Sequence, residues 1–273
     1  MHFITISQMM GTDGEKIARK VASDLSYSFY GDQELFRAAE ELDILADVRE
    51  LDEKAPPLLE RLFSEKPKVH LDRLQSVIYD VAKKGDAVLL GRGSQLLLNS
   101  FNCAFHVLVV GSEEKRIERV MKELSLSREE AGKVISRSDQ EKGEFIRFAF
   151  DKDWLNFRLY DLILNTDKLS LDSSVKAIID SFQSEEIKDC ARDSVNTLGK
   201  LSLQRRIESA YLEAGIQPTS LFFSVEDAES VRLYGIASSK EEKGRAENVV
   251  RKIKGVREIK NEINILPPGV GGY

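Results

Sequence analysis

The 273-residue sequence has few cysteines and histidines and no long apolar run, which excludes several classes of protein. Its two cysteines, Cys103 and Cys190, are too few for a disulfide framework and do not have metal-ligand spacing, so we expect a reducing cytoplasm. The three histidines are scattered, and none combines with a serine or cysteine into a nucleophilic arrangement. No apolar run reaches ~18 residues, and residues 1–10 lack a signal-peptide pattern, so we expect neither a transmembrane segment nor a leader.

The sequence also has no surplus of positive charge. The formal net charge is −6, which argues against a dedicated nucleic-acid binder. The charge is unevenly distributed, because residues 200–266 contain 12 basic and 10 acidic residues while the rest is clearly acidic. The length favours about two domains.

Short apolar runs alternate with helical patterns through residues 1–183, which we interpret as one domain. Residue 32 begins one predicted helix, and β-branched or apolar runs followed by glycine or polar residues predict the strands. Those strands are expected near 2–7, 27–30, 87–90, 105–110 and 160–164. Such alternation predicts an α/β fold with a parallel sheet flanked by helices. Ser112 is the expected N-cap of a helix over 113–124.

The rhythm changes after residue 183. Residues 184–199 are polar and are predicted to be a linker or an exposed helix. Residues 200–268 show the order helix, two strands, helix, strand, which predicts a small α+β (αββαβ) domain. Residues 269–273 are expected to be a flexible tail.

A glycine-containing loop follows the first strand and precedes a helix, which is the position of a phosphate-binding loop in P-loop proteins. The residues are Gly11, Thr12, Asp13, Gly14, Glu15 and Lys16. No register of this loop gives both the Gly-Lys pair and the following hydroxyl of a P-loop.

The order and spacing of several further segments resemble the cytidylate kinase-like family, a branch of the P-loop nucleoside monophosphate kinases. Besides the loop, the resemblance is carried by segments spread along residues 1–183: 4–7, 29–35, 88–93, 116–120, 153–154 and 160–167. It implies a P-loop NTPase-type fold, ATP and Mg²⁺ as cofactors, and a nucleoside monophosphate as acceptor, with CMP or dCMP expected first. The resemblance places ATP at the glycine loop and Arg119.

This sequence departs from the family at that loop. The family's loop reads like G-S-G-G-R-E-I, whereas Asp13 here stands where glycine allows phosphate to approach, and Glu15 stands where a basic residue is expected. A carboxylate beside a triphosphate is unfavourable by about 1 kcal/mol at 4 Å in water. Lys16 would compensate if it turned toward the phosphates, and would not if it pointed into solvent.

The resemblance also implies residues around the acceptor. Arg92 directly follows a predicted strand, where the family binds the acceptor phosphate, and Asp32 and Arg37 lie where it binds the acceptor nucleoside. Three further basic residues lie on the segment that resembles the lid and are expected to surround the transferred phosphate: Arg137, Lys142 and Arg147. Asp139 begins the family's Asp-x-x-Arg pattern, in which Lys142 replaces the arginine. Lysine cannot grip phosphate in a bidentate manner.

The C-terminal segment resembles a BON domain. The resemblance rests on the segments 231–235, 246–250, 254–256 and 259–261, and it implies a module that binds lipid surfaces or small ligands. A basic cluster adjoins its last helix and strand: Arg251, Lys252, Lys254, Arg257 and Lys260. This cluster would suit an anionic lipid or small ligand, or would simply be a solvated helix face.

Three functions agree with these observations. The first is a cytidylate kinase-like phosphotransferase with an appended binding module. The second is a binding or regulatory protein that keeps the kinase fold with weak or no catalysis, which Asp13 and Glu15 motivate. The third is a kinase for a different small acceptor. We expect the first.

Overall fold

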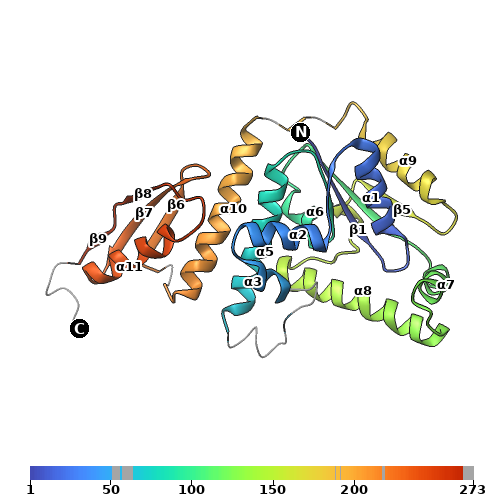
Figure 1. Ribbon diagram of the computed structural model, residues 1–273, viewed down its shortest axis with the longest axis horizontal. Coiled ribbons are helices and arrows are strands. Elements are labelled where there is room, and N and C mark those ends of the chain that lie inside the picture. The colour runs from blue at the N-terminus through green and yellow to red at the C-terminus, as the bar shows by residue number, and fades with distance from the viewer. Residues whose placement is uncertain (51–55, 57–63, 188, 191, 217–218, 267–273) are drawn as a thin grey trace. The chain divides into compact units, whose positions relative to one another are not determined.

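The computed structural model (Figure 1) describes residues 1–50, 56, 64–187, 189–190, 192–216 and 219–266. These residues form two compact units. Among the described residues, the first unit contains 1–36 and 84–190, and the second contains 37–50, 56, 64–83, 192–216 and 219–266. The predicted tail at 269–273 lies outside the described residues.

The first unit is built on a five-stranded parallel sheet in the order β2-β3-β1-β4-β5. Its strands are β1 (Phe3–Gln8), β2 (Ser28–Tyr30), β3 (Ala87–Leu90), β4 (Ala104–Val110) and β5 (Leu162–Asn165). Because they are short, apolar and separated by helices, the sheet is parallel, as the sequence predicts. The predicted α/β class is confirmed.

The helices of this unit are α1 (Gly14–Leu25), the first turns of α2 (Asp32–Glu41), α6 (Ser94–Leu97), α7 (Glu113–Leu124), α8 (Arg128–Phe150) and α9 (Leu171–Phe182), with a 3-10 turn at Phe157–Leu159. Serine side chains cap three of them, α7, α8 and α9. Ser112 caps α7 as predicted, since its side chain accepts a hydrogen bond from the Lys115 N–H at 3.4 Å. Ser127 and Glu130 form a capping box at the start of α8.

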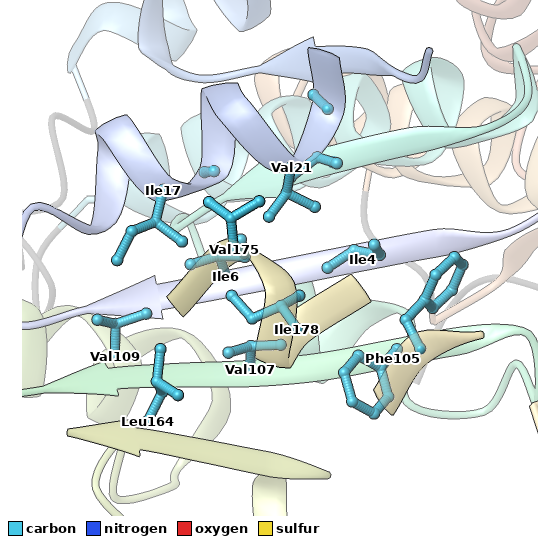
Figure 2. Packing of buried hydrophobic residues seen from close by; sticks show 14 residues of the cluster. Ile4, Ile6, Ile17, Val21, Phe105, Val107, Val109, Leu164, Val175 and Ile178 are labelled. Carbon is cyan, nitrogen blue, oxygen red and sulfur yellow. The ribbon is translucent and has the colours of Figure 1, made fainter. Parts of the chain in front are cut away.

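The core of the first unit lies where α1 and α9 cover the sheet (Figure 2). Ile4 and Ile6 of β1 pack with Ile17 of α1 and Ile178 of α9, and all four are at most 1% exposed. The helical spacing of the apolar residues in α1 puts them on this single face. The packing fixes β1 and the N-terminus of α1, and therefore fixes the loop between them.

The two cysteines form a disulfide, Cys103–Cys190, with their Cα atoms 4.9 Å apart. The sequence did not predict this pairing, because the two residues are 87 positions apart and no local pattern links them. Cys103 is buried just before β4, while the Cys190 N–H donates to the Met1 carbonyl at 3.2 Å. The disulfide therefore ties the segment after α9 to the sheet.

Reduction of this disulfide is expected to lower stability. A crosslink closing a loop of 87 residues restricts the unfolded chain and typically contributes about 2–4 kcal/mol. We expect Cys103→Ser, or treatment with a thiol reductant, to lower the melting temperature measured by calorimetry, and reductant to have no further effect on the variant. Equal melting temperatures of oxidised and reduced protein, with the bond verified by non-reducing mass spectrometry, would contradict this.

The second unit combines helices with a small mixed sheet. Its helices are the end of α2, α3 (Leu45–Glu50), α5 (Lys66–Lys83), α10 (Arg192–Glu213) and α11 (Lys240–Arg251). The sheet contains β6 (Leu221–Val225), antiparallel to β7 (Ser230–Ala237), with β8 (Glu258–Asn261) and β9 (Asn264–Ile265) parallel to β7. The segment 184–199, predicted as linker or helix, contains the start of α10 at residue 192.

Two interfaces hold the second unit together. Leu203 and Ile207 of α10 are fully buried against Leu233 of β7 and Val250 of α11. α10 also packs along α5. In that second interface Asp72 of α5 is 3% exposed, 3.4 Å from Arg205 and 3.7 Å from Lys68.

The burial of Asp72 predicts a pH dependence of stability. Burial raises its pKa from 3.8 to about 6, although Lys68 and Arg205 oppose the shift. Because the folded state holds this proton more tightly, the contribution of Asp72 to stability is fully present below pH ~4 and is lost as the pH rises to about 6. The loss corresponds to roughly 3 kcal/mol at most.

We expect Asp72→Asn to be more stable than the natural protein above pH 6, with the difference shrinking toward pH 4 in urea titrations. The exposed Asp193→Asn on α10 is the matched control and should give no such divergence. A constant difference between Asp72→Asn and the natural protein from pH 4 to 7 would contradict the shift.

Candidate functional site

A cavity of about 270 Å³ lies in the first unit at the carboxyl ends of β1 and β3. In parallel α/β sheets ligands bind at this edge. We call it the acceptor cavity because Asp32 and Arg92, which the family resemblance assigns to the acceptor, line it. Its walls come from β1, α1, α2, the β3–α6 turn, α8 and the segment after α8. The lining residues are Ser7, Gln8, Glu15, Arg19, Gly31, Asp32, Gln33, Leu90, Gly91, Arg92, Gly93, Gln95, Lys142, Phe145, Ile146 and Trp154.

The turn after β3 has an unusual backbone that positions Arg92. Gly91, Arg92 and Gly93 have φ values of 70°, 58° and 73°, so three successive residues adopt positive φ. This region suits glycine, whereas an arginine there is strained by about 1–2 kcal/mol. A Cβ on Gly93 would overlap the Phe150 ring. Strain kept at a cavity wall is typical of a functional position.

The Arg92 guanidinium is buried at the cavity wall. Its side chain is 1% exposed, and its Nε and Nη2 donate to Oδ1 of Asp32 at 3.0 and 2.9 Å. It also lies over the Phe36 ring at 5.8 Å. Asp32 is 54% exposed, so solvent can take over its hydrogen bonds when an anionic ligand competes for Arg92. The arrangement turns two guanidinium donors toward the Asp32 carboxylate at the cavity wall, and the same donors suit a ligand carboxylate or phosphate that replaces it.

The lining also contains the Trp154 ring and the Gln95 amide, whose orientation is set by hydrogen bonds around Tyr160. Tyr160 donates its proton to the Trp154 carbonyl at 2.7 Å, and its oxygen accepts a hydrogen bond from Gln95 Nε2 at 3.4 Å. Burial raises the pKa of Tyr160, so the phenol keeps that proton. Gln95 Oε1 is therefore left as a buried acceptor with no partner among the described residues. A ligand N–H would satisfy it.

Helix α8 contributes one of its three predicted basic residues to the cavity. Lys142 lines it, donates to the Gln8 carbonyl at 2.8 Å and lies 6.0 Å from the Trp154 ring centre. Arg137 is 75% exposed and pairs with Glu141 at 2.8 Å, outside the lining. Arg147 is exposed on the same helix and also lies outside the lining.

In the glycine loop, a carboxylate of the loop itself pairs with the lysine that would face a phosphate. Lys16 Nζ is 2.6 Å from Oδ1 of Asp13 and 3.4 Å from Oε1 of Glu123. The hydrogen bond that Lys16 donates to the Asp13 carboxylate is the main cause that raises the pKa of Lys16. Glu15 pairs with Arg19 at 2.9 Å. The positive charge of this loop is thus neutralised within the protein.

Hydrogen bonds and close packing fix the backbone of the rest of the loop. Thr12 is fully buried and its hydroxyl donates to the Met9 carbonyl at 2.7 Å, while a Cβ on Gly11 (φ 81°) would lie 2.8 Å from the Arg116 carbonyl. Gly14 begins α1. Arg119 donates to the carbonyls of Gly11 and Thr166 at 3.3 and 2.6 Å.

A second arginine of α7 connects the loop to α8. Arg116 is 5% exposed, and its Nε donates to the Met10 carbonyl at 2.7 Å. Its Nη2 pairs with Asp139 at 2.8 Å. Asp139, predicted to contact substrate, is therefore paired with Arg116 in this structure. Arg37 is exposed on α2.

The residues present do not form a protein-held site for Mg²⁺. Within the described parts of the chain, no group of three or more His, Cys, Asp or Glu side chains converges. The hydroxyl of Thr12, which is in the loop, donates its hydrogen bond to the Met9 carbonyl. We therefore assign no residue to the metal.

The structure brings together four of the predicted site residues in the acceptor cavity, namely Glu15, Asp32, Arg92 and Lys142. Sequence reasoning did not select Gln95 or Arg19. Gln95 lies three residues after Arg92, in the short helix α6 that begins after the turn, so its closeness to Arg92 in the sequence was the available signal. Arg19 is on the turn of α1 after Glu15, and its guanidinium lies 4.2 Å from the Phe29 ring centre.

The fold is that of a P-loop kinase-type α/β unit, with β1, a glycine loop at the N-terminus of α1 and a cavity beside it. Residues 3–168 match the cytidylate kinase-like family, so the chain belongs to that family. Residues 201–267 match the BON domain. Within the described residues no helix is long and apolar enough to cross a membrane.

Two relatives are distant. A cytidylate kinase of Methanocorpusculum labreanum is 27% identical over 187 residues, which is 68% of this chain and 98% of that protein. An S-adenosylmethionine-dependent nucleotide dehydratase of Lacinutrix mariniflava is 22% identical over 182 residues, 66% of this chain. The match covers only 36% of the dehydratase.

A solved structure shares its fold with much of this chain. It is an uncharacterised protein from Eubacterium ventriosum with a TM-score of 0.55 and 19% identity, covering 68% of this chain and all of that one. At this identity the likeness shows the fold alone.

Proposed function

We propose that the first unit binds a nucleoside monophosphate in the acceptor cavity and transfers the γ-phosphate of ATP to it. The observation that carries the proposal is the buried Arg92 fork at the carboxyl edge of the sheet, on a strained turn. Phosphoryl transfer depends mainly on positioning and on positive charge around the moving group. Arg92 would hold the acceptor phosphate, with Asp32 yielding its hydrogen bonds to the ligand or contacting the sugar.

The other end of the cavity favours a base with an exocyclic amino group. Gln95 Oε1 needs a donor, and Phe145 and Trp154 supply an apolar wall at 1% and 5% exposure. Cytosine offers an N–H donor there, whereas uracil offers a carbonyl. CMP or dCMP is therefore the proposed first acceptor.

The remaining site residues would act around the transferred phosphate. Lys142 already lines the cavity, whereas Arg137, Arg147 and Asp139 would act only after α8 moves or exchanges partners. The loop from Gly11 to Lys16 would hold ATP, with Arg119 bracing it. ATP supplied with Mg²⁺ is the proposed donor, and Arg37 keeps its predicted role at the acceptor as a proposal.

A second function is favoured by one observation, the Asp13–Lys16 pair. If that pair persists beside the triphosphate, the protein would bind nucleotides as a regulatory or binding protein with little turnover. A kinase for a different small acceptor would bind that acceptor in the same cavity.

For the BON segment we propose binding of a small ligand or an anionic lipid. A cytoplasmic location and the absence of nucleic acid among its partners stay predictions, and the disulfide makes the first of these testable by non-reducing mass spectrometry of protein from cells.

The test is a panel of nucleoside monophosphates with ATP and Mg²⁺, scored for diphosphate formation and, by calorimetry, for binding. We expect CMP or dCMP to bind and react in preference to UMP. Gln95→Leu should reduce that preference by about tenfold, since it removes the acceptor for the amino group.

The exposed Gln140→Leu on α8 is the matched control and should keep the preference. Binding of CMP without diphosphate formation would support the second function. Turnover of a non-nucleotide acceptor alone would support the third, and no nucleotide binding by any member of the panel would refute the proposal.

A further inference from the structure

A second cavity, of about 340 Å³, lies within the second unit. Its walls come from α10, the end of α11, the α2–α3 turn and one residue of α5. Its size falls within the range of small-molecule pockets. Part of the wall is apolar, with Ile44, Ala210 and Ile253 among the lining residues, and the rest is charged.

One lining residue is a buried cation without a carboxylate partner. Arg206 of α10 is 9% exposed, and its Nη1 donates to the Lys254 carbonyl at 2.6 Å. Its Nε is buried without an acceptor among the described residues. A guanidinium has five N–H donors, and leaving a buried charge unpaired is costly. Such a group in a folded protein calls for a missing partner.

The other charges of the cavity do not supply that partner. Arg73 pairs with Asp47 and Glu213, both at 2.6 Å, and Lys254 pairs with Asp43 at 3.5 Å. The carboxylates at the wall are therefore already engaged. Asp80 acts on Arg206 from beyond ion-pair distance and pairs with Lys83 at 3.2 Å.

Lys252 adds a second uncompensated charge. It lines the cavity, is exposed, and has no carboxylate within 4 Å among the described residues. Four cations line the wall. Arg206 and Lys252 are the two that form no ion pair with a carboxylate of the described residues. Burial also lowers the pKa of Arg206, which is the direction expected of a cation that lacks its counterion.

We propose that this cavity binds the phosphate group of a small phosphate ester, with Arg206 as its main ligand and Lys252 at its mouth. Arginine matches a phosphate with parallel N–H donors, and the apolar wall would accommodate the organic part of the ester. The ester would be either a free metabolite or the headgroup of a phospholipid, since both present the same phosphate chemistry. The inference rests on the binding role proposed for the BON segment and gives it a site and a ligand chemistry. The site is separate from the acceptor cavity, so its test does not depend on the proposed kinase activity.

The test uses the intact chain and phenyl phosphate as the soluble probe, measured by calorimetry and by thermal shift. We expect phenyl phosphate to bind and to raise the melting temperature. Arg206→Met should weaken binding by about tenfold or more, and Lys252→Ala by about fivefold. Without ligand, Arg206→Met should melt no lower than the natural protein, because it removes an uncompensated buried charge.

The matched control is Arg251→Met on α11, a 63% exposed arginine that pairs with Glu247. It should change the affinity by less than about twofold. Arg92→Ala should also leave the Arg206-dependent binding intact, which separates this site from the acceptor cavity. Vesicles of phosphatidylcholine with and without phosphatidic acid form the second arm.

Arg206-dependent binding of phenyl phosphate identifies a soluble ester as the source. Arg206-dependent binding only to vesicles that contain phosphatidic acid identifies a lipid headgroup. The proposal is overturned if neither probe binds in a manner that Arg206→Met and Lys252→Ala weaken.

Discussion

Replacement of Arg92 by alanine is expected to remove acceptor binding, with kcat/KM for CMP falling by about 10²–10⁴. The side chain is 1% exposed and presents two donors that would each make a charge-assisted hydrogen bond to phosphate. Each such bond contributes about 1.5–3 kcal/mol. Because Asp32 is half-exposed, loss of its partner leaves a carboxylate that water can solvate, so the variant should fold. Calorimetry with CMP measures the effect even if turnover is slow.

Two further variants separate this role from a general loss of charge. Arg92→Lys keeps the charge without the fork and should fall between the natural protein and Arg92→Ala. Arg128→Ala, at the exposed start of α8 where Arg128 pairs with Glu114, removes an arginine from the same unit and should leave CMP binding unchanged. Arg92→Ala binding CMP as tightly as Arg128→Ala would contradict the proposed site.

The sequence was sufficient to predict the five strands of the parallel sheet and the position of Arg92 at its carboxyl edge. Continuous apolar runs such as residues 87–90 become buried parallel strands because both faces of the sheet are covered. A polar or glycine turn after such a strand lies at the carboxyl edge of the sheet, which places Arg92 correctly. These are local patterns, and the packing of the core follows from them.

The partners of the charged residues could not be predicted in the same way. Asp139 pairs with Arg116 across 23 positions of the chain, and Lys142 reaches the Gln8 carbonyl across 134. The sequence of a charged helix face is similar in two cases. Its charges can be exposed to solvent, as for Arg137, or can contact a neighbouring segment, as for Lys142. The disulfide was missed for the same reason, since only the folded sheet brings residues 103 and 190 together.

The contacts of the phosphate loop explain why its altered sequence is tolerated. Arg116 and Arg119 donate to the carbonyls of Met10 and Gly11, so the loop backbone is held by α7. Asp13 sits in the left-handed region with φ 59°, a conformation that aspartate tolerates better than most residues. The loop thus keeps its shape while its charge changes, and shape and charge can be tested separately.

Replacement of Asp13 by glycine is expected to strengthen ATP–Mg²⁺ binding by roughly fivefold to several-hundredfold. The range follows from removing a unit charge about 4 Å from phosphate, which is worth about 1 kcal/mol in water and about 4 kcal/mol near a protein surface. The change also frees Lys16, whose ammonium is now 2.6 Å from Asp13. Glycine adopts the required positive φ without strain. Calorimetry with ATP and Mg²⁺ is the measurement, with diphosphate formation as a second readout.

The matched control is Asp151→Gly at the end of α8. Asp151 is also an aspartate in the left-handed region, with φ 52°, and is exposed, so both glycines relieve the same backbone strain. Only Asp13→Gly should change the affinity for ATP, and adding Lys16→Met to it should reverse most of the gain. Equal ATP affinities of the two glycine variants would mean that the Asp13 carboxylate is not what limits this loop. A gain in affinity without a gain in turnover would favour a binding protein over a kinase, because the donor site would then be repaired while phosphoryl transfer stayed absent.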